Sequence, residues 1–510
     1  MTPCSTARPR VATRATRDRS GCGATTSTRR ASRRPERRKR LAGWLRGTAA
    51  RPCPAFARKR LDRSGVRRTS EGAQTVRHTG AQRERHASVT LEAFGAPPDS
   101  VLCVRVTAEA ARRFLVARHA LAPARSLNGG PDAVLEVFRR LGSVQFDPLA
   151  IAGRNHDLVL HARVADYDPA WCDLLYERRE VFEAYNKGLS LVPTSEFPWF
   201  RGIMSRKPSR TLAENADVAE RVLERIRAEG PLSALDFERE RGQTTDWFGM
   251  PTNAVRAVLE AYTVTGVLGL ARRDGNRRYY DLLERLLPAD VLARSIPQRE
   301  QFRHKLLSRY RAHGLLGVGG GGSGIFGGLG PAKPDPRWPE YPGRTALRED
   351  LIADGKLVPV EVEGVNGKRF VLEEEAGLLE RPPEPPPSVA FLPPFDPLVW
   401  DRPLLGSLFE FEYVWELFFP PDKRRWGWYV LPMLFRDRLV GRIEPRIDRA
   451  AGQVQVLGLW WEDGFAPRRS EGFVEAMRDA LRAYLHFGGA IRLEWGPHLA
   501  MERRLFLPRP

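Results

Sequence analysis

The sequence predicts an α+β protein in which tandem winged helix-turn-helix domains are followed by a C-terminal β-barrel-like domain. Three observations predict this fold class. Residues 214–282 have the pattern of three helices followed by a two-stranded hairpin, and residues 296–373 repeat that order in outline. Beyond a proline-rich run at residues 381–388, strand-like segments alternate with turn residues.

The excess positive charge is concentrated at one end of the chain. The net charge is +20, but the first 90 residues hold 24 of the 82 Lys and Arg residues and only 5 of the 62 Asp and Glu residues. Residues 1–98 also lack apolar periodicity, so we expect a disordered basic extension. This extension could bind nucleic acid non-specifically, be dispensable, or arise from translation that starts upstream of the true start codon.

Composition excludes several classes of protein. With 510 residues and 42% hydrophobic residues, the chain can form several ordinary domains. It has no apolar run of about 18 residues and no signal-peptide pattern, so we expect no membrane partner and a cytoplasmic, nucleoid-associated location. The five cysteines are scattered without a C-x-x-C pair, which indicates neither a disulfide framework nor a metal site.

The first ordered unit is expected over residues 101–211. A helix is predicted over 107–121 with Thr107 as a possible cap, and a second over 131–141, between Pro131 and Gly142. A third amphipathic stretch runs from about residue 149 to 164, so the unit has the helix content of a helix-turn-helix domain.

The second unit, residues 212–290, has clearer signals. One helix ends at Gly230-Pro231, a second is predicted behind Ser233 with Asp236 in a variant capping box, and a third begins near Pro251. The Asp274-Gly275 pair then predicts a hairpin turn.

The remaining units follow in order. A third winged-helix-like unit is expected over 291–380, with a hairpin that turns at Asn366-Gly367, and the linker at 381–388 follows it. The barrel-like domain, 389–510, is expected to contain strands within 415–420, 427–435, 438–447, 452–461 and 491–495, with a helix over 471–489 before the last strand.

The most informative short segment is LGSVQFDPLAIAGRNH, residues 141–156. Pro148 favours an extended conformation at Asp147, and alternate side chains of an extended chain share a face. Gln145 and Asp147 should therefore point the same way, opposite Val144 and Phe146. Two uses remain open: Asp147 could cap a helix that starts at Leu149 while Gln145 is simply exposed, or the carboxylate and amide could stabilise a sugar cation and hold a water.

Three blocks give the chain a family resemblance. VQFDPLAIAGRNHDLVLHARV, FLPPFDPLVWDRPLL and PPDKRRWGWYVLPMLF resemble the winged helix-turn-helix crosslink-repair DNA glycosylases, the YcaQ/AlkZ-like family, from about Val104 to the C-terminus. The resemblance implies tandem winged helices with a β-barrel and removal of bulky or N7-alkylated purines, including interstrand crosslinks, from double-stranded DNA. It implies no metal or cofactor and an abasic-site product.

The resemblance also assigns roles to the motif. Asp147 would stabilise the sugar cation or act as general base, and Gln145 would position the attacking water. No lysine within the motif is placed as a nucleophile, so a monofunctional glycosylase is expected. One departure is Lys187, which stands where many family members carry histidine, and this leaves the lesion preference and crosslink unhooking open.

Cationic and aromatic residues are candidate DNA contacts, each with a plainer interpretation. His156 could be structural, the hairpin arginines could form a solvated tip, Lys187 could be an ordinary solvated lysine, and Arg402 could instead hold the barrel to the helical domains together with Asp396, Trp400 and Asp401. The candidates are Arg154, His156 and Arg163 on the helix after the motif, Lys187, Arg272, Arg273, Arg277 and Arg278 at the hairpin, and Arg402, Lys423, Arg424, Arg425 and Trp426.

Two other functions compete with the enzymatic one. Winged helices are usually binding modules, so a non-catalytic DNA-binding transcriptional regulator is the main alternative. An RNA-binding protein is supported only by the basic extension and ranks last. We expect a monomer, because a damaged base does not require a palindromic partner.

Overall fold

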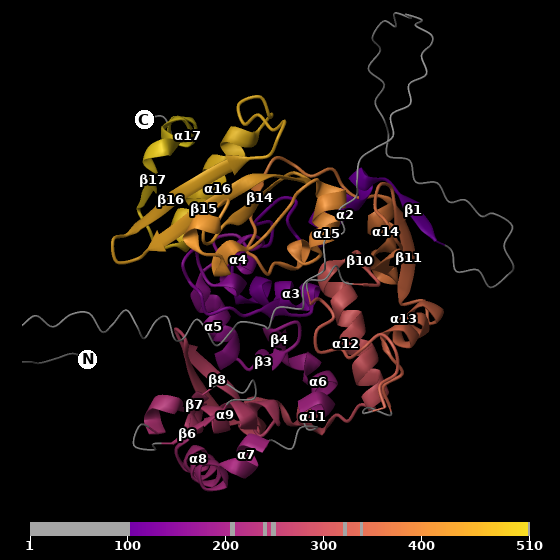
Figure 1. Ribbon diagram of the computed structural model, residues 1–510, viewed down its shortest axis with the longest axis vertical. Helices are drawn as coiled ribbons and strands as arrows, with labels where there is room; N and C mark the ends of the chain where they lie inside the picture. The colour runs from indigo at the N-terminus through magenta and orange to yellow at the C-terminus, as the bar shows by residue number, and fades with distance from the viewer. Residues whose placement is uncertain are drawn as a thin grey trace, which may run out of the picture. The chain divides into compact units, whose positions relative to one another are not determined.

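The computed structural model describes residues 103–204, 210–237, 242–245, 251–319, 324–336 and 340–507 (Figure 1). The expected basic extension, residues 1–98, lies outside them. The described chain is a mixed α+β protein, as predicted, and its sheets are open. None of the described helices combines the length and apolar character that crossing a bilayer requires.

The first two helices form where the sequence predicts, although α2 ends three residues before the predicted end at residue 121. Helix α2 spans Ala108–Arg118, and the Thr107 side chain accepts a hydrogen bond from the Ala110 amide. Helix α3 spans Pro131–Leu141 and ends at Gly142, which has a left-handed φ of 70°. The third helix is shorter than expected, because α4 covers only Asn155–His161 and residues 146–154 form an irregular loop.

A three-stranded sheet completes this part of the chain. Helix α5 (Pro169–Glu177) leads into β3 (Val181–Tyr185) and β4 (Leu189–Pro193). The short strand β2 (Val144–Gln145) adds to β4, in the order β2-β4-β3. The Gln-x-Asp motif therefore leaves the sheet directly from an edge strand.

The next unit contains the predicted hairpin. Strands β8 (Leu268–Asp274) and β9 (Arg277–Leu282) pair across Gly275, following helices α8 (Ala216–Glu229) and α9 (Ala254–Val264). The prediction of a helix behind Ser233 is wrong for the described residues. Strand β5 (Leu232–Ser233) and a single 3-10 turn, Ala234–Phe237, stand there, although the Asp236 carboxylate does accept bonds from the Ser233 amide and hydroxyl at 2.6 and 2.8 Å.

A four-stranded sheet joins distant parts of the sequence. Helices α12 (Gln298–His313) and α13 (Arg344–Ala353) precede the hairpin of β11 (Leu357–Val362) and β12 (Arg369–Leu372), which turns near Gly367 as predicted. Strand β1 (Val104–Val106) pairs parallel with β11 at one side, and β10 (Leu316–Gly317) pairs with β12 at the other. The start of the ordered chain thus belongs to a sheet formed some 250 residues later.

The C-terminal part is a five-stranded open sheet. Its order is β13 (Val389–Phe391), β14 (Leu431–Phe435), β15 (Arg438–Asp448), β16 (Gln453–Trp461) and β17 (Arg492–Trp495), and α16 (Phe473–Phe487) lies along it (Figure 1). No closed barrel forms among the described residues, because β13 and β17 remain edge strands. The prediction of a strand within residues 415–420 is also wrong, since only a 3-10 turn, Glu416–Phe418, forms there.

Smaller elements connect these units. They are α6 (Phe197–Met204), α7 (Arg210–Glu214), β6 (Gln243–Thr245), β7 (Pro251–Asn253), α10 (Leu283–Leu286), α11 (Ala289–Ala293), α14 (Ala376–Glu380), α15 (Arg402–Phe409) and α17 (Ala500–Phe506). One apolar core runs from α3 and β2 through the β8–β9 hairpin to α16, so the motif segment is packed from several directions.

Candidate active site

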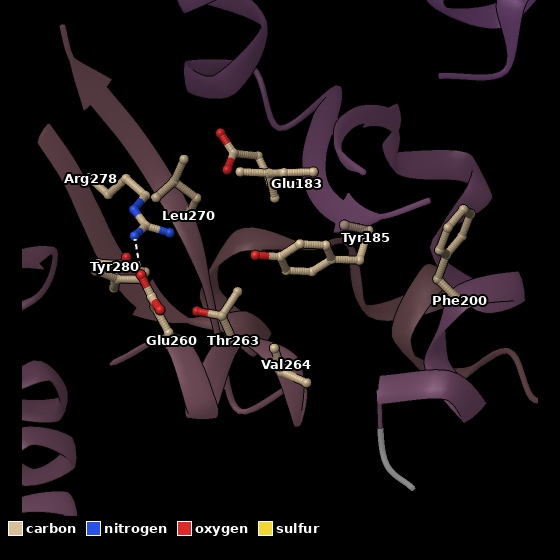
Figure 2. Close-up of a pocket in the computed structure, with 11 residues that line it drawn as sticks. Glu183, Tyr185, Phe200, Glu260, Thr263, Val264, Leu270, Arg278 and Tyr280 are labelled. Carbon is tan, nitrogen blue, oxygen red and sulfur yellow. Dashed lines mark hydrogen bonds and ion pairs between the residues drawn. The ribbon is translucent and has the colours of Figure 1, made fainter. Parts of the chain in front are cut away.

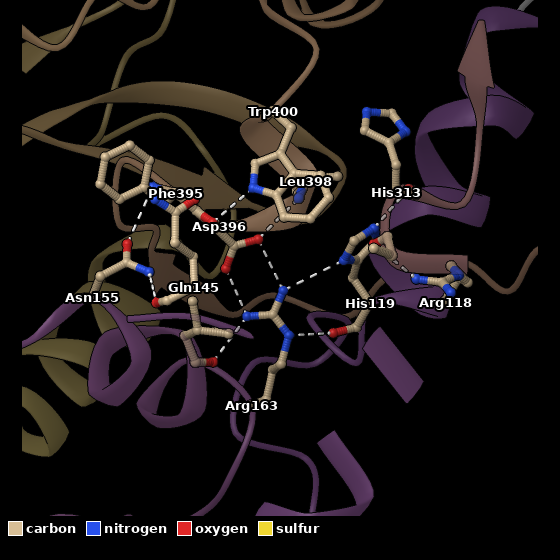
Figure 3. Close-up of polar contacts among 12 residues, drawn as sticks. Arg118, His119, Gln145, Asn155, Arg163, His313, Phe395, Asp396, Leu398 and Trp400 are labelled. Atoms are coloured by element: carbon tan, nitrogen blue, oxygen red, sulfur yellow. Dashed lines mark hydrogen bonds and ion pairs between the residues drawn. The ribbon is translucent and has the colours of Figure 1, made fainter. Parts of the chain in front are cut away.

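The backbone at Gln145 is fixed on both sides. Gln145 pairs with Ser190 in the β2–β4 ladder, and the next amide, that of Phe146, donates to the Leu189 carbonyl at 2.8 Å. The Asn155 side chain donates to the Gln145 carbonyl at 2.8 Å and accepts from the Phe395 amide at 3.1 Å (Figure 3). Asn155 therefore links the motif to the C-terminal part, and the partly exposed Gln145 side chain projects from a rigid support.

Asp147 is held by a local turn and does not cap a helix. Its Oδ1 accepts a hydrogen bond from the Leu149 amide at 2.9 Å across Pro148, which is an Asx turn, and α4 begins only at Asn155. Oδ2 has no hydrogen-bond partner among the described residues. Oδ2 is not fully buried, so it retains contact with solvent.

Burial sets the electrostatics of Asp147. Desolvation raises the pKa of its carboxyl, against the opposing effect of the Leu149 amide hydrogen bond. Tyr429 is buried nearby, and its own pKa is raised by burial and by the charge of Asp147. Asp147 is therefore a rigid, partly desolvated carboxylate with one available oxygen, which suits a general base or an electrostatic stabiliser.

The β8–β9 hairpin braces the centre of the motif. The Arg273 guanidinium lies 3.8 Å from the centroid of the Phe146 ring, and His156 stacks on the same ring at 4.9 Å. Arg273 also forms a bidentate ion pair with Glu183 at 2.6 and 2.8 Å, and Asn276 donates to the Pro148 carbonyl at 3.4 Å. These contacts hold the residues on either side of Asp147 in place.

The C-terminal part braces the loop that follows. The Ile447 amide donates to the Ile151 carbonyl at 2.9 Å, and the Tyr484 hydroxyl donates to the Ala152 carbonyl. Gly153 has a φ of 113°, and a Cβ there would lie 2.8 Å from the Phe487 ring, so only glycine fits against α16. The motif loop is thus immobilised from three separate regions of the sequence.

The structure adds Lys187 to the site. Its Nζ lies 3.4 Å from Oε1 of Gln145 and over the Trp400 and Phe395 rings, at 4.9 and 5.6 Å from their centroids. Burial, with the charges of Arg309 and Arg402, lowers the pKa of Lys187 to about 7. The sequence suggested Lys187 as a phosphate contact or a solvated residue, and its position beside Gln145 had no local signal because the two are 42 residues apart.

Comparison with known proteins places this site in a family. The family model described as DNA glycosylase AlkZ-like matches residues 138–487, which include the whole motif and Lys187. The chain belongs to the AlkZ-like DNA glycosylase family. Among solved structures, DNA glycosylase AlkZ of Streptomyces sahachiroi is similar, with 19% sequence identity, coverage of 77% of this chain and 99% of that chain, and a TM-score of 0.48.

Arg163 of this AlkZ-like protein lies where it cannot reach DNA. Both it and Asp396 have no exposed surface, and their bidentate ion pair measures 2.7 and 3.0 Å (Figure 3). Arg163 also donates to the carbonyls of His119 and Val159 at 2.8 and 2.9 Å. The expected phosphate contact is therefore replaced by a structural tie between the first unit and the C-terminal part.

The two other candidates near α4 are also committed to protein contacts. Arg154 precedes the helix and pairs with Asp157 at 2.6 Å. His156 is buried, and burial lowers its pKa to about 4, so it is neutral at physiological pH and packs on Phe146. The structure therefore favours the structural interpretation of His156.

The hairpin arginines separate into two pairs. Arg273 and Arg278 face inward, where Arg278 pairs with Glu260 at 2.5 Å beside a pocket into which Tyr185 points from β3 (Figure 2). Arg272 and Arg277 are exposed, and Arg272 stacks on Tyr279 at 3.6 Å. Only the exposed pair is free to contact a phosphate.

The basic triplet before Trp426 is similarly divided. Lys423 and Arg425 are exposed, whereas Arg424 donates to the Phe419 carbonyl at 2.9 Å. The guanidinium groups of Arg425 and Arg442 lie 4.5 and 4.4 Å from the centroid of the Trp426 ring, so the ring is partly covered.

Arg402 serves the FDPLVWDR loop. It donates to the Pro394 carbonyl at 2.8 Å and lies over the Tyr413 ring at 4.1 Å, so these two contacts stay within the C-terminal part and do not link it to the helical units as expected. Its Nη1 is buried without a hydrogen-bond partner, and its charge contributes to the lowered pKa of Lys187. No group of three or more His, Cys, Asp and Glu side chains that could hold a metal ion occurs in the described chain.

Proposed function

We propose that this AlkZ-like protein is a DNA repair glycosylase that hydrolyses the N-glycosidic bond of bulky or N7-alkylated purines in double-stranded DNA and leaves an abasic site. The observation that carries the proposal is the geometry of Asp147, a rigid and partly desolvated carboxylate with one solvent-accessible oxygen. Family membership supports the same reaction class.

The chemistry follows from the charge of the damaged base. An N7-alkylated purine is cationic and leaves readily, and its departure leaves positive charge on the sugar. The Asp147 carboxylate stabilises that charge and accepts the proton of the attacking water, and its raised pKa makes it the stronger base. The Gln145 amide, held two residues away, positions the water. A group of this kind contributes roughly 10²–10⁴-fold to a rate.

The exposed cations define the proposed path of the DNA backbone. Arg272 and Arg277 lie on the hairpin that contacts the motif, and Lys423 and Arg425 lie on the loop that leads to Tyr429, beside Asp147. In this proposal, residues 101–211, 212–290 and 291–380 act as tandem winged-helix domains, residues 389–510 act as the C-terminal domain, and the protein works as a monomer. Interstrand crosslinks are included among the substrates to be tested.

The test is release of base from defined lesions. Purified protein is incubated with duplexes that carry N7-methylguanine, a bulky N7-alkylguanine or an N7-linked crosslink. Released base is measured by mass spectrometry, and abasic sites are revealed by alkali. We expect release by wild type and loss of release in Asp147→Asn. A matched control is Asp166→Asn, which changes an exposed carboxylate with a positive φ of 47° that asparagine adopts easily.

Two outcomes would overturn the proposal. One is no release from any of the lesions by folded wild type, and the other is equal rates for wild type and Asp147→Asn. Protection of one specific sequence in undamaged DNA, without base release, would instead identify a transcriptional regulator.

A further inference from the structure

The turn between β3 and β4 brings an amine to the motif that the motif itself lacks. Residues 186–188 form this turn, which includes Lys187, and Gly188 has a φ of 139°. A Cβ at Gly188 would lie 3.0 Å from the Gln145 amide nitrogen, so glycine is required for the close approach. This approach places the Lys187 Nζ 3.4 Å from Oε1 of Gln145. The expectation of a monofunctional enzyme depended on the absence of such an amine.

We propose that Lys187 is the nucleophile of a second reaction at this site, in which the enzyme forms a Schiff base with the abasic sugar and cleaves the strand by β-elimination. This inference rests on the proposed function, because base removal supplies the abasic sugar and Gln145 lies where that sugar is held.

The surroundings of Lys187 favour a neutral, nucleophilic amine. Lys187 forms no ion pair with a carboxylate among the described residues, and its neighbours are two aromatic rings and the guanidinium groups of Arg309 and Arg402. Burial and these two cations bring its pKa to about 7, so a large fraction is unprotonated at neutral pH. Lys187 is nevertheless partly exposed.

A second lysine shows why position matters as well as basicity. Burial and Arg309 also lower the pKa of Lys305 to about 7. Its Nζ, however, donates to the Tyr185 carbonyl at 3.3 Å, and the residue is only 2% exposed. Lys305 therefore has the basicity of a nucleophile without access to DNA, which makes it a matched control.

The reaction balances without a co-reactant other than water. The neutral Nζ of Lys187 attacks C1′ of the ring-opened abasic aldehyde to give a carbinolamine, which takes up one proton from solvent and loses water to form a protonated imine. The Asp147 carboxylate removes a proton from C2′, the C3′–O3′ bond breaks, and the electron pair leaves with the 3′ phosphate oxygen. Water then hydrolyses the protonated imine, which releases an unsaturated aldehyde, the neutral Lys187 amine and one proton, and Asp147 returns the C2′ proton to solvent.

The experiment uses DNA in which the abasic site is already present, so it does not depend on base removal. Full-length protein is mixed with a duplex that contains one abasic site, borohydride is added, and covalent complexes are separated by denaturing gel and mapped by proteolysis and mass spectrometry. We expect a complex mapped to Lys187, loss of that complex in Lys187→Arg, and its retention in Lys305→Met and in Lys356→Arg, an exposed lysine. Strand cleavage at the abasic site without alkali should likewise occur with wild type, Lys305→Met and Lys356→Arg and be lost in Lys187→Arg.

The outcomes separate this inference from the proposed function. If wild type gives no trapped complex, or a complex that maps to another lysine, the inference is overturned, even if Lys187→Arg fails to fold. If alkylated bases are still released in that case, the proposed glycosylase stands without strand cleavage. A complex at Lys187 in a protein that releases no alkylated base would support the amine and overturn the proposed base removal.

Discussion

Replacement of Arg163 by methionine tests whether this residue is structural or a DNA contact. Methionine keeps much of the apolar volume but removes the guanidinium, and the Asp396 carboxylate is then left without its ionic partner. Neither residue has exposed surface, so water cannot replace the lost contacts. The carbonyls of His119 and Val159 also lose their hydrogen-bond donor.

The expected cost follows from these contacts. Removal of one partner of a buried ion pair destabilises a protein by about 3–5 kcal/mol. Asp396 keeps one bond, from the Leu398 amide at 3.0 Å, which limits the loss, while the two orphaned carbonyls increase it. We therefore expect Arg163→Met to lower the free energy of unfolding by about 3–5 kcal/mol. The double variant with Asp396→Asn should recover part of this loss, because no unpaired charge remains buried.

The assay is urea unfolding followed by tryptophan fluorescence, together with DNA affinity measured where every variant is folded. We expect Arg163→Met to have lower stability and unchanged DNA affinity per folded molecule. Wild-type stability combined with weaker DNA binding would refute it and restore the expected phosphate contact.

Three further predictions concern the motif and its surroundings. Arg272→Ala and Arg277→Ala should each lower by about one the number of phosphate contacts inferred from the salt dependence of DNA binding, without loss of stability. Arg273→Ala should instead destabilise the fold, because the buried Glu183 loses its ion-pair partner and keeps only the hydrogen bond from the Tyr176 hydroxyl; salt titrations and unfolding curves distinguish the variants. Gly188→Ala should lower base release by about tenfold or more, because its Cβ displaces Gln145, and a crystal structure with an unmoved Gln145 would contradict this. Trapping by Lys187 should rise as pH increases through about 7, since the protonated amine is inert, and a yield that is flat from pH 6 to 8 would exclude this lysine.

Local signals predicted local structure well. The Thr107 cap, the Pro131 and Gly142 limits of α3 and the turn at Gly275 all depend on a few neighbouring residues, and the structure confirms them. The start of α4 was placed too early, because apolar residues that pack against the hairpin and α16 imitate helical periodicity in an irregular loop.

Contacts between residues that are far apart in the sequence could not be predicted from it. Arg163 was expected on the helix after the motif as a phosphate contact, but it lies beyond the end of α4, and only the fold brings Asp396, 233 residues away, to meet it. The β1–β11 pairing and the approach of Lys187 to Gln145 arise in the same way. Pro148 and strand alternation act within four residues and predicted that Gln145 and Asp147 share a face, but their catalytic roles were assigned by the family resemblance and not by this local pattern.

The most direct test of the central claim is the single-turnover rate of base release by Asp147→Asn, measured with its stability. The asparagine Oδ1 can keep the Leu149 amide bond, and the substitution removes a charge from a desolvated position. Because the folded-state pKa of Asp147 is raised above its unfolded value, the ionised carboxylate destabilises the fold above that pKa, so the variant should be at least as stable at pH 7. We predict a rate lower by roughly 10²–10⁴-fold with stability retained or increased. A folded Asp147→Asn protein that releases N7-alkylguanine at the wild-type rate would contradict the account.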